Sequence, residues 1–349
     1  MSGADFRIVR LTAQIFQPGE YELRRLAENG FAIVQCHDED PAAIARAVAD
    51  ADVVATIGTP MPRIVIDALG AGPARAIARF GTGTDKIDVA RATELGLVVC
   101  NTPYFCVEDM ADHVMAMIRH FTRQLGPAHR AMHDGDLARA RGFIAKANRM
   151  SASTLGLIGF GRSAVHTAQR ARGFGMRVLA TRSNPDAPRD EADALGVVMT
   201  DLDTVLRESD YVSLHVPLTK RTQNMIGDAA LAKMKPQAVL INTSRGKLVD
   251  EDALFRALTQ GRIAGAGIDT YGSIDIFVDR IEPPVHPLAA LDNVILSPHT
   301  AGGSVQARFD MMDAGVQNLI ELRAGRMPAP ETIVNPEVRT RFPFEGRVR

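Results

Sequence analysis

Two side chains in the C-terminal half of the sequence, Arg245 and His299, are of types that bind a carboxylate and exchange a proton. Arg245 follows the apolar run 238–242, and a guanidinium recognises a carboxylate through two parallel hydrogen bonds. His299 follows a second apolar run, 294–296, and an imidazole titrates near neutral pH, so it suits general acid–base work. Because ligands of open α/β sheets bind beyond the carboxyl ends of strands, both residues are candidates for a site.

A glycine-rich turn, Gly159-Phe-Gly161-Arg-Ser-Ala164, follows the apolar run 155–158 and precedes a helical pattern. In this spacing the first glycine makes a tight turn, the second lets the backbone approach a pyrophosphate, and a small third residue lets helix and strand pack closely. Backbone amides at the start of the helix then face the anion. An ordinary strand-to-helix turn is the alternative, but the position favours a dinucleotide site formed by Gly159, Gly161, Arg162 and Ser163.

The strand predicted to follow this turn runs from residue 177 to 180 and leads into Thr181, Arg182 and Ser183, without a carboxylate. An acid at this place binds the ribose 2′-hydroxyl of NAD, whereas an arginine accommodates the 2′-phosphate of NADP. A guanidinium grips a phosphate in a bidentate fork, and an acid would repel it. We therefore expect Arg182 and Ser183 to bind the cofactor and to favour NADP over NAD. The alternative is that Arg182 is a solvated surface residue.

Short apolar runs alternate with amphipathic stretches along both halves of the chain, which indicates βαβ units around parallel sheets. The strands predicted in the first half are 6–11, 31–36, 53–57, 76–80 and 97–100. Those predicted in the second half are 155–158, 177–180, 211–216, 238–242, 265–269 and 294–296. Long helices are predicted over 107–125 and 305–322, and the polar stretch 126–150 is expected to be a surface connector.

Length and composition narrow the class of protein. At 349 residues the chain favours two domains with a cleft between them. It has no apolar run near the roughly 18 residues that cross a membrane, and no secretory signal is visible, so a cytoplasmic location is expected. The three cysteines lack CxxC spacing, which argues against a disulfide framework and a metal site. A net charge of −1 offers no basic face to nucleic acid, so a small-molecule ligand is expected.

Further segments go beyond a generic nucleotide fold. They are Leu214-His-Val-Pro-Leu-Thr219, Asn242-Thr-Ser-Arg-Gly246, Gly265-Ala-Gly-Ile-Asp269, Glu282-Pro283 and Ser297-Pro-His-Thr-Ala-Gly302. Together they resemble the D-isomer-specific 2-hydroxyacid dehydrogenases, in particular the glyoxylate/hydroxypyruvate reductase-like members. Upstream, 79–88 and 99–112 resemble the branch that includes the C-terminal-binding-protein corepressors. The resemblance covers nearly the whole chain.

The resemblance implies an α/β protein with two doubly wound parallel-sheet domains. Residues 1–104 and 303–349 would form a discontinuous, flavodoxin-like substrate domain. Residues 105–302 would form an inserted Rossmann domain that binds NAD(P). The helix 107–125 would then be an interdomain and dimer-contact element, and a homodimer is expected.

The resemblance also implies a reaction, the interconversion of a small 2-oxo acid, such as glyoxylate or hydroxypyruvate, and its D-2-hydroxy acid. Reduction requires a cation for the substrate, a proton donor for the developing alkoxide and a positioned hydride. Arg245 would bind the oxo acid and His299 would be the general acid and base. Glu282 would hold His299 and raise its pKa. An insertion between Tyr271 and Glu282 leaves Asp275 and Asp279 as alternative partners of His299.

The remaining site residues implied by the resemblance fall into two groups. The cofactor would also contact Pro217, Thr243, Ser244, Asp269 and Gly302, with Asp269 accepting the nicotinamide carboxamide and Gly302 allowing a close backbone approach. The substrate carboxylate would bind Thr82 and Gly83 in addition to Arg245, and a plain turn is the alternative for this Gly-Thr-Gly segment.

A second class of function is a dinucleotide-sensing, corepressor-like binding protein with a weak catalytic role or none. The Arg, Glu and His set favours an enzyme over this hypothesis. A formate dehydrogenase is less expected, because hydride abstraction from formate leaves an acid–His pair idle. The identity of the 2-hydroxy acid stays open, while NADP as cofactor would favour reduction as the physiological direction.

Overall fold

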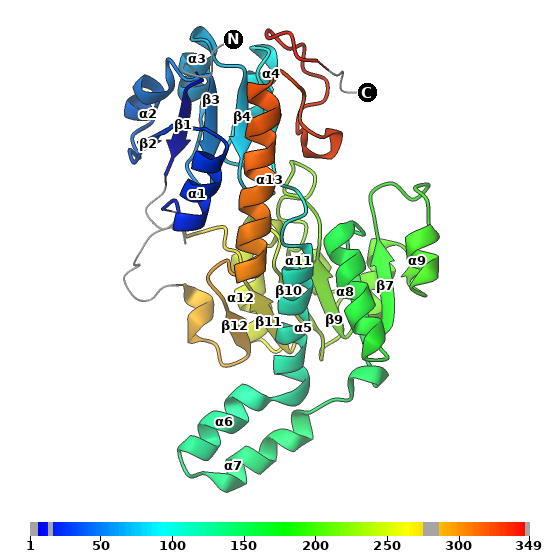
Figure 1. The fold of residues 1–349 in the computed structure, drawn as a ribbon. Helices are drawn as coiled ribbons and strands as arrows, with labels where there is room; N and C mark the ends of the chain where they lie inside the picture. The colour runs from blue at the N-terminus through cyan, green and yellow to red at the C-terminus, as the bar shows by residue number, and fades with distance from the viewer. Residues whose placement is uncertain (1–5, 13–16, 275–285, 346–349) are drawn as a thin grey trace. The chain divides into compact units, whose positions relative to one another are not determined.

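The computed structural model describes residues 6–12, 17–274 and 286–345 (Figure 1). These residues form two compact units, 6–12 and 17–105 with 304–345, and 106–274 with 286–303. Each unit is built around its own parallel sheet, so the two doubly wound domains predicted from the sequence are present. No helix in the described ranges is long and apolar enough to cross a lipid bilayer.

The first unit contains a five-stranded sheet in the order β2-β1-β3-β4-β5, in which every neighbouring pair is parallel. This is the flavodoxin-like strand order. The strands are β1 (Ile8–Leu11), β2 (Ile33–Cys36), β3 (Val53–Thr56), β4 (Ala76–Arg79) and β5 (Val98–Cys100). Its helices are α1 (Glu20–Glu28), α2 (Pro41–Val48), α3 (Arg63–Ala71), α4 (Val89–Glu94) and α13 (Val305–Arg323).

The C-terminal segment returns to this N-terminal sheet. Asn335 lies beside β5, where its side-chain oxygen accepts a hydrogen bond from the amide of Val99 at 2.8 Å and its amide donates to the carbonyl of Leu97 at 3.0 Å. In α13, a Cβ added at Gly315 would lie 2.7 Å from the ring of Phe80, which is fully buried. The small residue therefore lets α13 pack directly on the strand end that precedes residues 81–83.

The second unit contains a seven-stranded parallel sheet in the order β12-β11-β10-β9-β6-β7-β8. The strands are β6 (Thr154–Ile158), β7 (Arg177–Thr181), β8 (Val198–Met199), β9 (Tyr211–Leu214), β10 (Val239–Asn242), β11 (Gly265–Ile268) and β12 (Val294–Leu296). Strand order reverses between β6 and β9, the switch point at which dinucleotides bind in such sheets. The short edge strand β8 was not predicted from the sequence.

Helices cover both faces of this sheet, so its central strands are buried on both sides and read as continuous apolar runs. The helices are α5 (Val107–Arg123), α8 (Arg162–Gly173), α9 (Asp190–Ala194), α10 (Leu202–Glu208), α11 (Asp228–Leu231) and α12 (Glu251–Thr259). Helix α5 ends two residues before the predicted boundary, because Gln124 adopts a left-handed conformation with φ of 52°.

Residues 126–150, expected only to be a surface connector, are largely helical. They contribute to α6 (Leu125–His133) and α7 (Leu137–Gly142), followed by short 3-10 turns at Phe143–Lys146 and Met150–Ala152. The side chain of Asp136 caps α7 by accepting from the amide of Arg139 at 2.9 Å. In Figure 1 this pair of helices extends away from the sheet of its own unit. Since α6 buries only Ala131 and α7 buries no residue, no apolar stripe signals these helices in the sequence.

Candidate active site

The glycine-rich turn links β6 to α8 as predicted and leaves space in front of the helix. Gly159 has a φ of 98°, and a Cβ there would lie 2.4 Å from the carbonyl oxygen of His215, so only glycine fits. At Gly161 an added Cβ would meet nothing within 4 Å. The open side of the turn faces the first amides of a 12-residue helix. These residues therefore fit the pyrophosphate of a dinucleotide.

His215 connects this turn to the neighbouring strand β9. Its Nδ1 lies 3.1 Å from the hydroxyl of Ser163, in the first turn of α8, and its Nε2 lies 3.0 Å from the hydroxyl of Ser213. Desolvation of the imidazole lowers the pKa of His215 to about 4. The ring is therefore neutral at neutral pH, and it suits hydrogen bonding better than proton transfer.

Arg182 follows the end of β7, as predicted, and holds the loop beyond it. Its Nη1 donates to the carbonyl of Pro188 at 2.9 Å, and its Nη2 donates to the carbonyl of Ala187. The buried Nε has no hydrogen-bond partner within the described ranges. Ser183 is exposed beside it. The guanidinium is thus fixed directly after β7, where the cofactor ribose is predicted to bind, and its Nε–H could donate one more hydrogen bond.

The ends of β9 and β10 place the next group of predicted residues. The hydroxyl of Ser244 donates to the carbonyl of Leu214 at 2.6 Å, so this side chain joins the two strand ends. Thr243 is buried, and its hydroxyl has no hydrogen-bond partner in the described part of the chain. Pro217 is exposed. Thr243 therefore retains a polar atom that a cofactor could satisfy.

Arg245 is presented by a turn that side chains define. Asn242 accepts from the amide of Ser244 at 3.1 Å and donates to the carbonyl of Arg245 at 2.9 Å. The guanidinium donates to the carbonyl of Ser244 at 2.7 Å. The following glycine is obligatory, because a Cβ at Gly246 would lie 1.8 Å from the backbone of Tyr271. The partly buried Arg245 thus leaves the end of β10 in a fixed direction.

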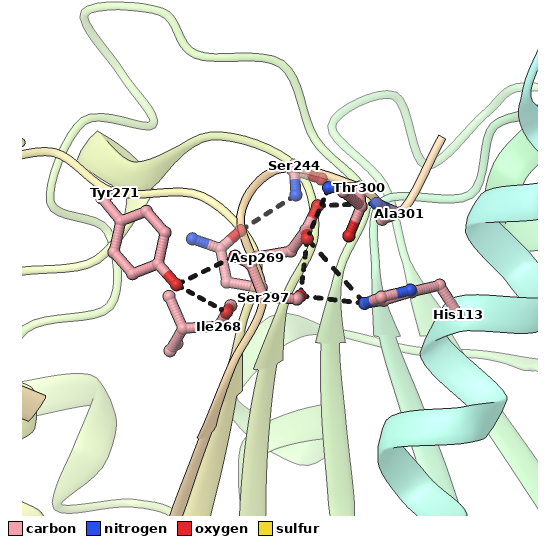
Figure 2. A network of polar contacts seen from close by, with 9 residues as sticks. His113, Ser244, Ile268, Asp269, Tyr271, Ser297, Thr300 and Ala301 are labelled. Carbon is pink, nitrogen blue, oxygen red and sulfur yellow. Dashed lines mark hydrogen bonds and ion pairs between the residues drawn. The ribbon is translucent and has the colours of Figure 1, made fainter. Parts of the chain in front are cut away.

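A buried carboxylate, that of Asp269 at the end of β11, organises the adjoining turn (Figure 2). Its Oδ1 accepts from the hydroxyl of Ser297 at 2.6 Å and from the amide of Thr300 at 2.9 Å. Its Oδ2 accepts from the amide of Ala301 at 3.0 Å. His113, on α5, lies 3.0 Å from the hydroxyl of Ser297 and 3.8 Å from the carboxylate. Since Ser297 donates to Asp269, His113 must donate to Ser297.

His299 lies inside the turn that Asp269 holds. Its φ is 56°, which is uncommon for a residue with a side chain, and its amide donates to the carbonyl of Asp269 at 2.9 Å. Such conformations persist where the surroundings over-determine them, and they cluster at functional sites. The hydroxyl of Tyr271 adds a further constraint, since its single proton is shared between the carbonyls of Ser297 at 2.9 Å and Ile268 at 3.2 Å. Burial raises the pKa of this phenol.

Sequence reasoning missed Ser297, Tyr271 and His113 as members of this network. Ser297 stands within Ser-Pro-His299, but its hydroxyl gives no signal of its own. His113 lies far away in the sequence and is one of nine histidines. The predicted contact of Asp269 with a nicotinamide carboxamide stays a prediction, while the structure shows its oxygens engaged by the turn. Gly302 follows this turn, and a Cβ there would lie 3.0 Å from the sulfur of Cys106.

Glu282 lies outside the described residues, as do its alternatives Asp275 and Asp279. The residues that flank this segment are held together by Glu251 at the start of α12. Its carboxylate accepts from the amide of Gly272 at 2.7 Å and lies 3.2 Å from Nε2 of the buried His286. Burial works to raise the pKa of Glu251, but the hydrogen bonds from His286, Gly272 and Ser273 lower it overall.

In the first unit, Thr82 and Gly83 lie in a turn after β4. The carbonyl of Thr82 accepts from the side chain of Asn101 at 2.8 Å, and the carbonyl of Gly83 accepts from Nε of Arg79 at 2.9 Å. Within the described ranges, the amides of Thr82 and Gly83 donate no hydrogen bond. Both N–H groups are available to an anion, as the predicted substrate role requires.

The structure therefore gathers Arg245, Asp269 and His299 at the carboxyl ends of β10, β11 and β12, which are successive neighbours in one sheet. A glycine turn at the switch point of the same sheet fits a dinucleotide. A sheet of this order with these groups at one edge has the architecture of a nicotinamide-dependent dehydrogenase.

Comparisons with known proteins specify the family. The family model of the D-isomer specific 2-hydroxyacid dehydrogenase, NAD binding domain, matches residues 115–301. The chain is 37% identical over 334 residues to a glyoxylate reductase of Korarchaeum cryptofilum, covering 92% of this chain and 97% of that protein. The chain belongs to the D-isomer specific 2-hydroxyacid dehydrogenase family and is an NAD(P)-dependent oxidoreductase that interconverts 2-oxo and 2-hydroxy acids.

Solved structures extend the similarity to the whole fold. One is an NADPH-dependent glyoxylate/hydroxypyruvate reductase from Sinorhizobium meliloti in complex with citrate, with a TM-score of 0.78, 30% identity, and coverage of 94% of this chain and 97% of that chain. Another is a D-lactate dehydrogenase from Aquifex aeolicus complexed with NAD and lactic acid, with a TM-score of 0.83, 25% identity, and coverage of 94% and 98%. Relatives with either nicotinamide cofactor thus share this architecture.

Replacement of the buried carboxylate tests the turn that carries His299. In Asp269→Asn, an amide N–H₂ would face donors, and we expect a loss of about 1–3 kcal/mol of stability for the unsatisfied groups. We also expect kcat/KM to fall by at least about tenfold, because a displaced His299 loses its geometry. Thermal unfolding and steady-state kinetics measure both effects. The exposed Asp292→Asn is the matched control; unchanged stability and activity of Asp269→Asn would contradict the assignment.

Proposed function

We propose that this enzyme reduces a small 2-oxo acid of the glyoxylate and hydroxypyruvate class to its D-2-hydroxy acid, with NADPH as the preferred cofactor. The observation that carries the proposal is the placement of Arg245 and His299 at one sheet edge, with His299 held in a left-handed conformation by Asp269. Relatives named glyoxylate reductase and the similarity to an NADPH-dependent glyoxylate/hydroxypyruvate reductase support this choice of substrate.

In this proposal each residue has a defined task. Arg245 binds the carboxylate and orients the carbonyl of the oxo acid, since its guanidinium forms two parallel hydrogen bonds to such a group. The amides of Thr82 and Gly83, which donate no hydrogen bond within the described residues, bind the same carboxylate in this proposal. When bound, the reduced nicotinamide supplies the hydride. His299 donates the proton that the carbonyl oxygen takes up as it becomes a hydroxyl, and it accepts that proton in the reverse direction.

The cofactor is held along the same edge of the sheet. Gly159, Gly161, Arg162 and Ser163 bind the pyrophosphate, and Thr243 offers a buried hydroxyl that lacks a partner among the described residues. Pro217, Ser244 and Gly302 complete this surface, with Ser244 contributing mainly through the backbone because its hydroxyl is bound to Leu214. Asp269 contributes through the turn that it holds.

Glu282 is proposed to hold the imidazole of His299 through a carboxylate–imidazole hydrogen bond. A nearby carboxylate favours the protonated form of an imidazole, which is the form that donates a proton during reduction. Glu251 accepts from the amide of Gly272 and lies 3.2 Å from Nε2 of His286, so it joins the described residues on either side of this segment. Asp275 and Asp279 are the alternative partners.

Substitution of the two principal residues tests the chemistry. We expect Arg245→Lys and His299→Gln each to lower kcat/KM for glyoxylate or hydroxypyruvate by about three orders of magnitude, because one loses bidentate recognition and the other the proton donor. Dinucleotide affinity stays within about threefold of wild type, because neither change alters the glycine turn. Steady-state kinetics with both oxo acids and a fluorescence titration with NADPH measure the two quantities.

Exposed residues of the same types provide the controls, Arg63→Lys and His37→Gln, which leave turnover unchanged. Wild-type turnover in both Arg245→Lys and His299→Gln would refute the assignment. The same assay on Glu282→Gln, Asp275→Asn and Asp279→Asn identifies the carboxylate that supports His299.

The cofactor preference rests on Arg182. Its guanidinium is held after β7 by two backbone carbonyls, and the buried Nε has no partner in the described ranges. We expect Arg182→Ala to raise the KM for NADPH by about 10- to 100-fold, the loss of a charge-assisted contact, and to change the KM for NADH by less than about threefold. Arg189→Ala, an exposed arginine of the same loop, tests the selectivity of the effect. A wild-type enzyme that prefers NADH would overturn the proposal.

A homodimer is proposed, with α6, α7 and the following turn as its contact surface. These elements expose Leu125, Met132, Leu137 and Ile144, and the side chain of Ile144 is 74% exposed. Exposed apolar side chains of this kind are typical of an interface, and in the dimer we expect a second copy of this chain to cover them.

Light scattering coupled to gel filtration tests the dimer. We expect twice the chain mass of 37.7 kDa for the wild type and a shift toward the single-chain mass for Ile144→Asp, because a buried unpaired charge opposes association. Val198→Asp, at a 50% exposed valine in β8, leaves the mass unchanged. A wild-type mass of one chain at micromolar concentration would contradict the proposal.

A further inference from the structure

Ser163, His215 and Ser213 form a chain of hydrogen bonds that ends at the start of α8. Ser213 lies in β9 and is completely buried. His215 follows the same strand, and its Nε2 is 3.0 Å from the hydroxyl of Ser213. Its Nδ1 is 3.1 Å from the hydroxyl of Ser163, which is partly exposed in the first turn of α8. Two hydroxyls and one imidazole are thus joined by two hydrogen bonds. Because each hydroxyl has one proton, the donor and the acceptor of each bond can be derived.

The buried end of the chain fixes the first proton. Within the described ranges, the hydroxyl of Ser213 has His215 as its one hydrogen-bond partner. If Ser213 accepted a proton from Nε2, its own O–H would be left unpaired in the interior, which is costly. If Ser213 donates to Nε2, no donor is unsatisfied. Ser213 is therefore the donor, and Nε2 carries no proton.

The second proton follows from the charge of the ring. Desolvation lowers the pKa of His215 to about 4, so the imidazole is neutral at neutral pH and carries one N–H. Since Nε2 is the acceptor, that proton is on Nδ1. The Nδ1–H then donates to the oxygen of Ser163, and the hydroxyl proton of Ser163 remains available to another acceptor.

We propose that His215 is a positioning residue of the dinucleotide site: it fixes the Ser163 hydroxyl as a donor toward an anionic phosphate oxygen at the start of α8. The inference rests on the proposed role of Ser163 in cofactor binding. It adds the reason why the Ser163 hydroxyl acts as a donor toward the phosphate. With the opposite tautomer, Ser163 would donate to Nδ1 and present lone pairs to the phosphate, which would repel it. The buried Ser213, which lies in β9, thereby determines that Ser163 donates its proton to the phosphate.

The space around the turn agrees with this arrangement. The carbonyl oxygen of His215 lies 2.4 Å from where a Cβ of Gly159 would be, so the backbone that follows β9 packs closely against the glycine turn. The amide of His215 donates to the carbonyl of Ile158 at 2.7 Å, which fixes the ring relative to the turn. Gly161 leaves the region in front of the helix open. A phosphate placed there meets the helix amides together with the Ser163 hydroxyl.

A double-mutant cycle tests the coupling through NADPH affinity, measured by nicotinamide fluorescence. We expect Ser163→Ala to weaken binding about tenfold, the loss of one hydrogen bond to a charged group. Ser213→Ala, which removes a side chain that touches no ligand, weakens it by about threefold to tenfold because it frees the opposite tautomer. In the Ser163→Ala background, Ser213→Ala has no further effect. Ser209→Ala, a completely buried serine of the same unit, leaves the affinity unchanged.

The tautomer itself is measured in the ligand-free protein by ¹⁵N NMR of histidine-labelled enzyme, with His215→Gln used to assign the signal. We expect a protonated Nδ1 and an unprotonated Nε2 in wild type, and a shift toward protonated Nε2 in Ser213→Ala. A protonated Nε2 in wild type, or equal effects of Ser213→Ala in both backgrounds, would overturn the inference. Failure of the proposed cofactor role is distinct: Ser163→Ala would then bind NADPH as wild type does, while the NMR result would still hold.

Discussion

The carboxylate of Asp269 is the interaction on which the geometry of the candidate site depends. It is completely buried, and it accepts hydrogen bonds from a serine hydroxyl and from two consecutive backbone amides of the turn after β12. A buried carboxylate is tolerated only when such donors compensate its lost hydration. If the turn relaxed, the buried carboxylate would lose these donors, which is unfavourable. The turn therefore keeps His299 in a conformation that an isolated histidine rarely adopts.

Most of the fold could be predicted because its signals are local. Buried parallel strands read as short apolar runs, and eleven of the twelve strands in the described part of the chain were placed within a few residues of their observed ends. The edge strand β8 has two residues, only one of them partly buried, and gives no such run. Helices α6 and α7 were missed for a related reason. They bury almost no side chains within their own chain. Their sequences therefore lack the helical spacing of apolar residues that marks a helix packed on a core.

The candidate site was predictable only in part, because motifs report positions along the chain and the network depends on positions in space. Arg245 and His299 follow strands that become near neighbours, so the strand order alone brings them to one edge. The hydroxyl of Ser297 and the imidazole of His113 come together from 184 residues apart, and nothing in either segment announces the pairing. The cofactor contact expected of Ser244 stays a prediction, and the structure shows that its hydroxyl also joins β10 to β9. A polar residue type alone does not tell a ligand contact from a brace.

The braces themselves explain why this edge suits the proposed chemistry. Ser244 joins β10 to β9, Asn242 shapes the turn of Arg245, and Asp269 and Tyr271 join β11 to the turn after β12. These hydrogen bonds form without a ligand. The polar groups that they hold therefore need little reorganisation when charge develops during hydride and proton transfer. Electrostatic stabilisation of that kind depends on dipoles that are already oriented. Dipoles that must reorient during the reaction stabilise the transition state less, because their reorientation costs free energy. The same logic applies at the glycine turn, where a neutral imidazole orients a hydroxyl through hydrogen bonds alone.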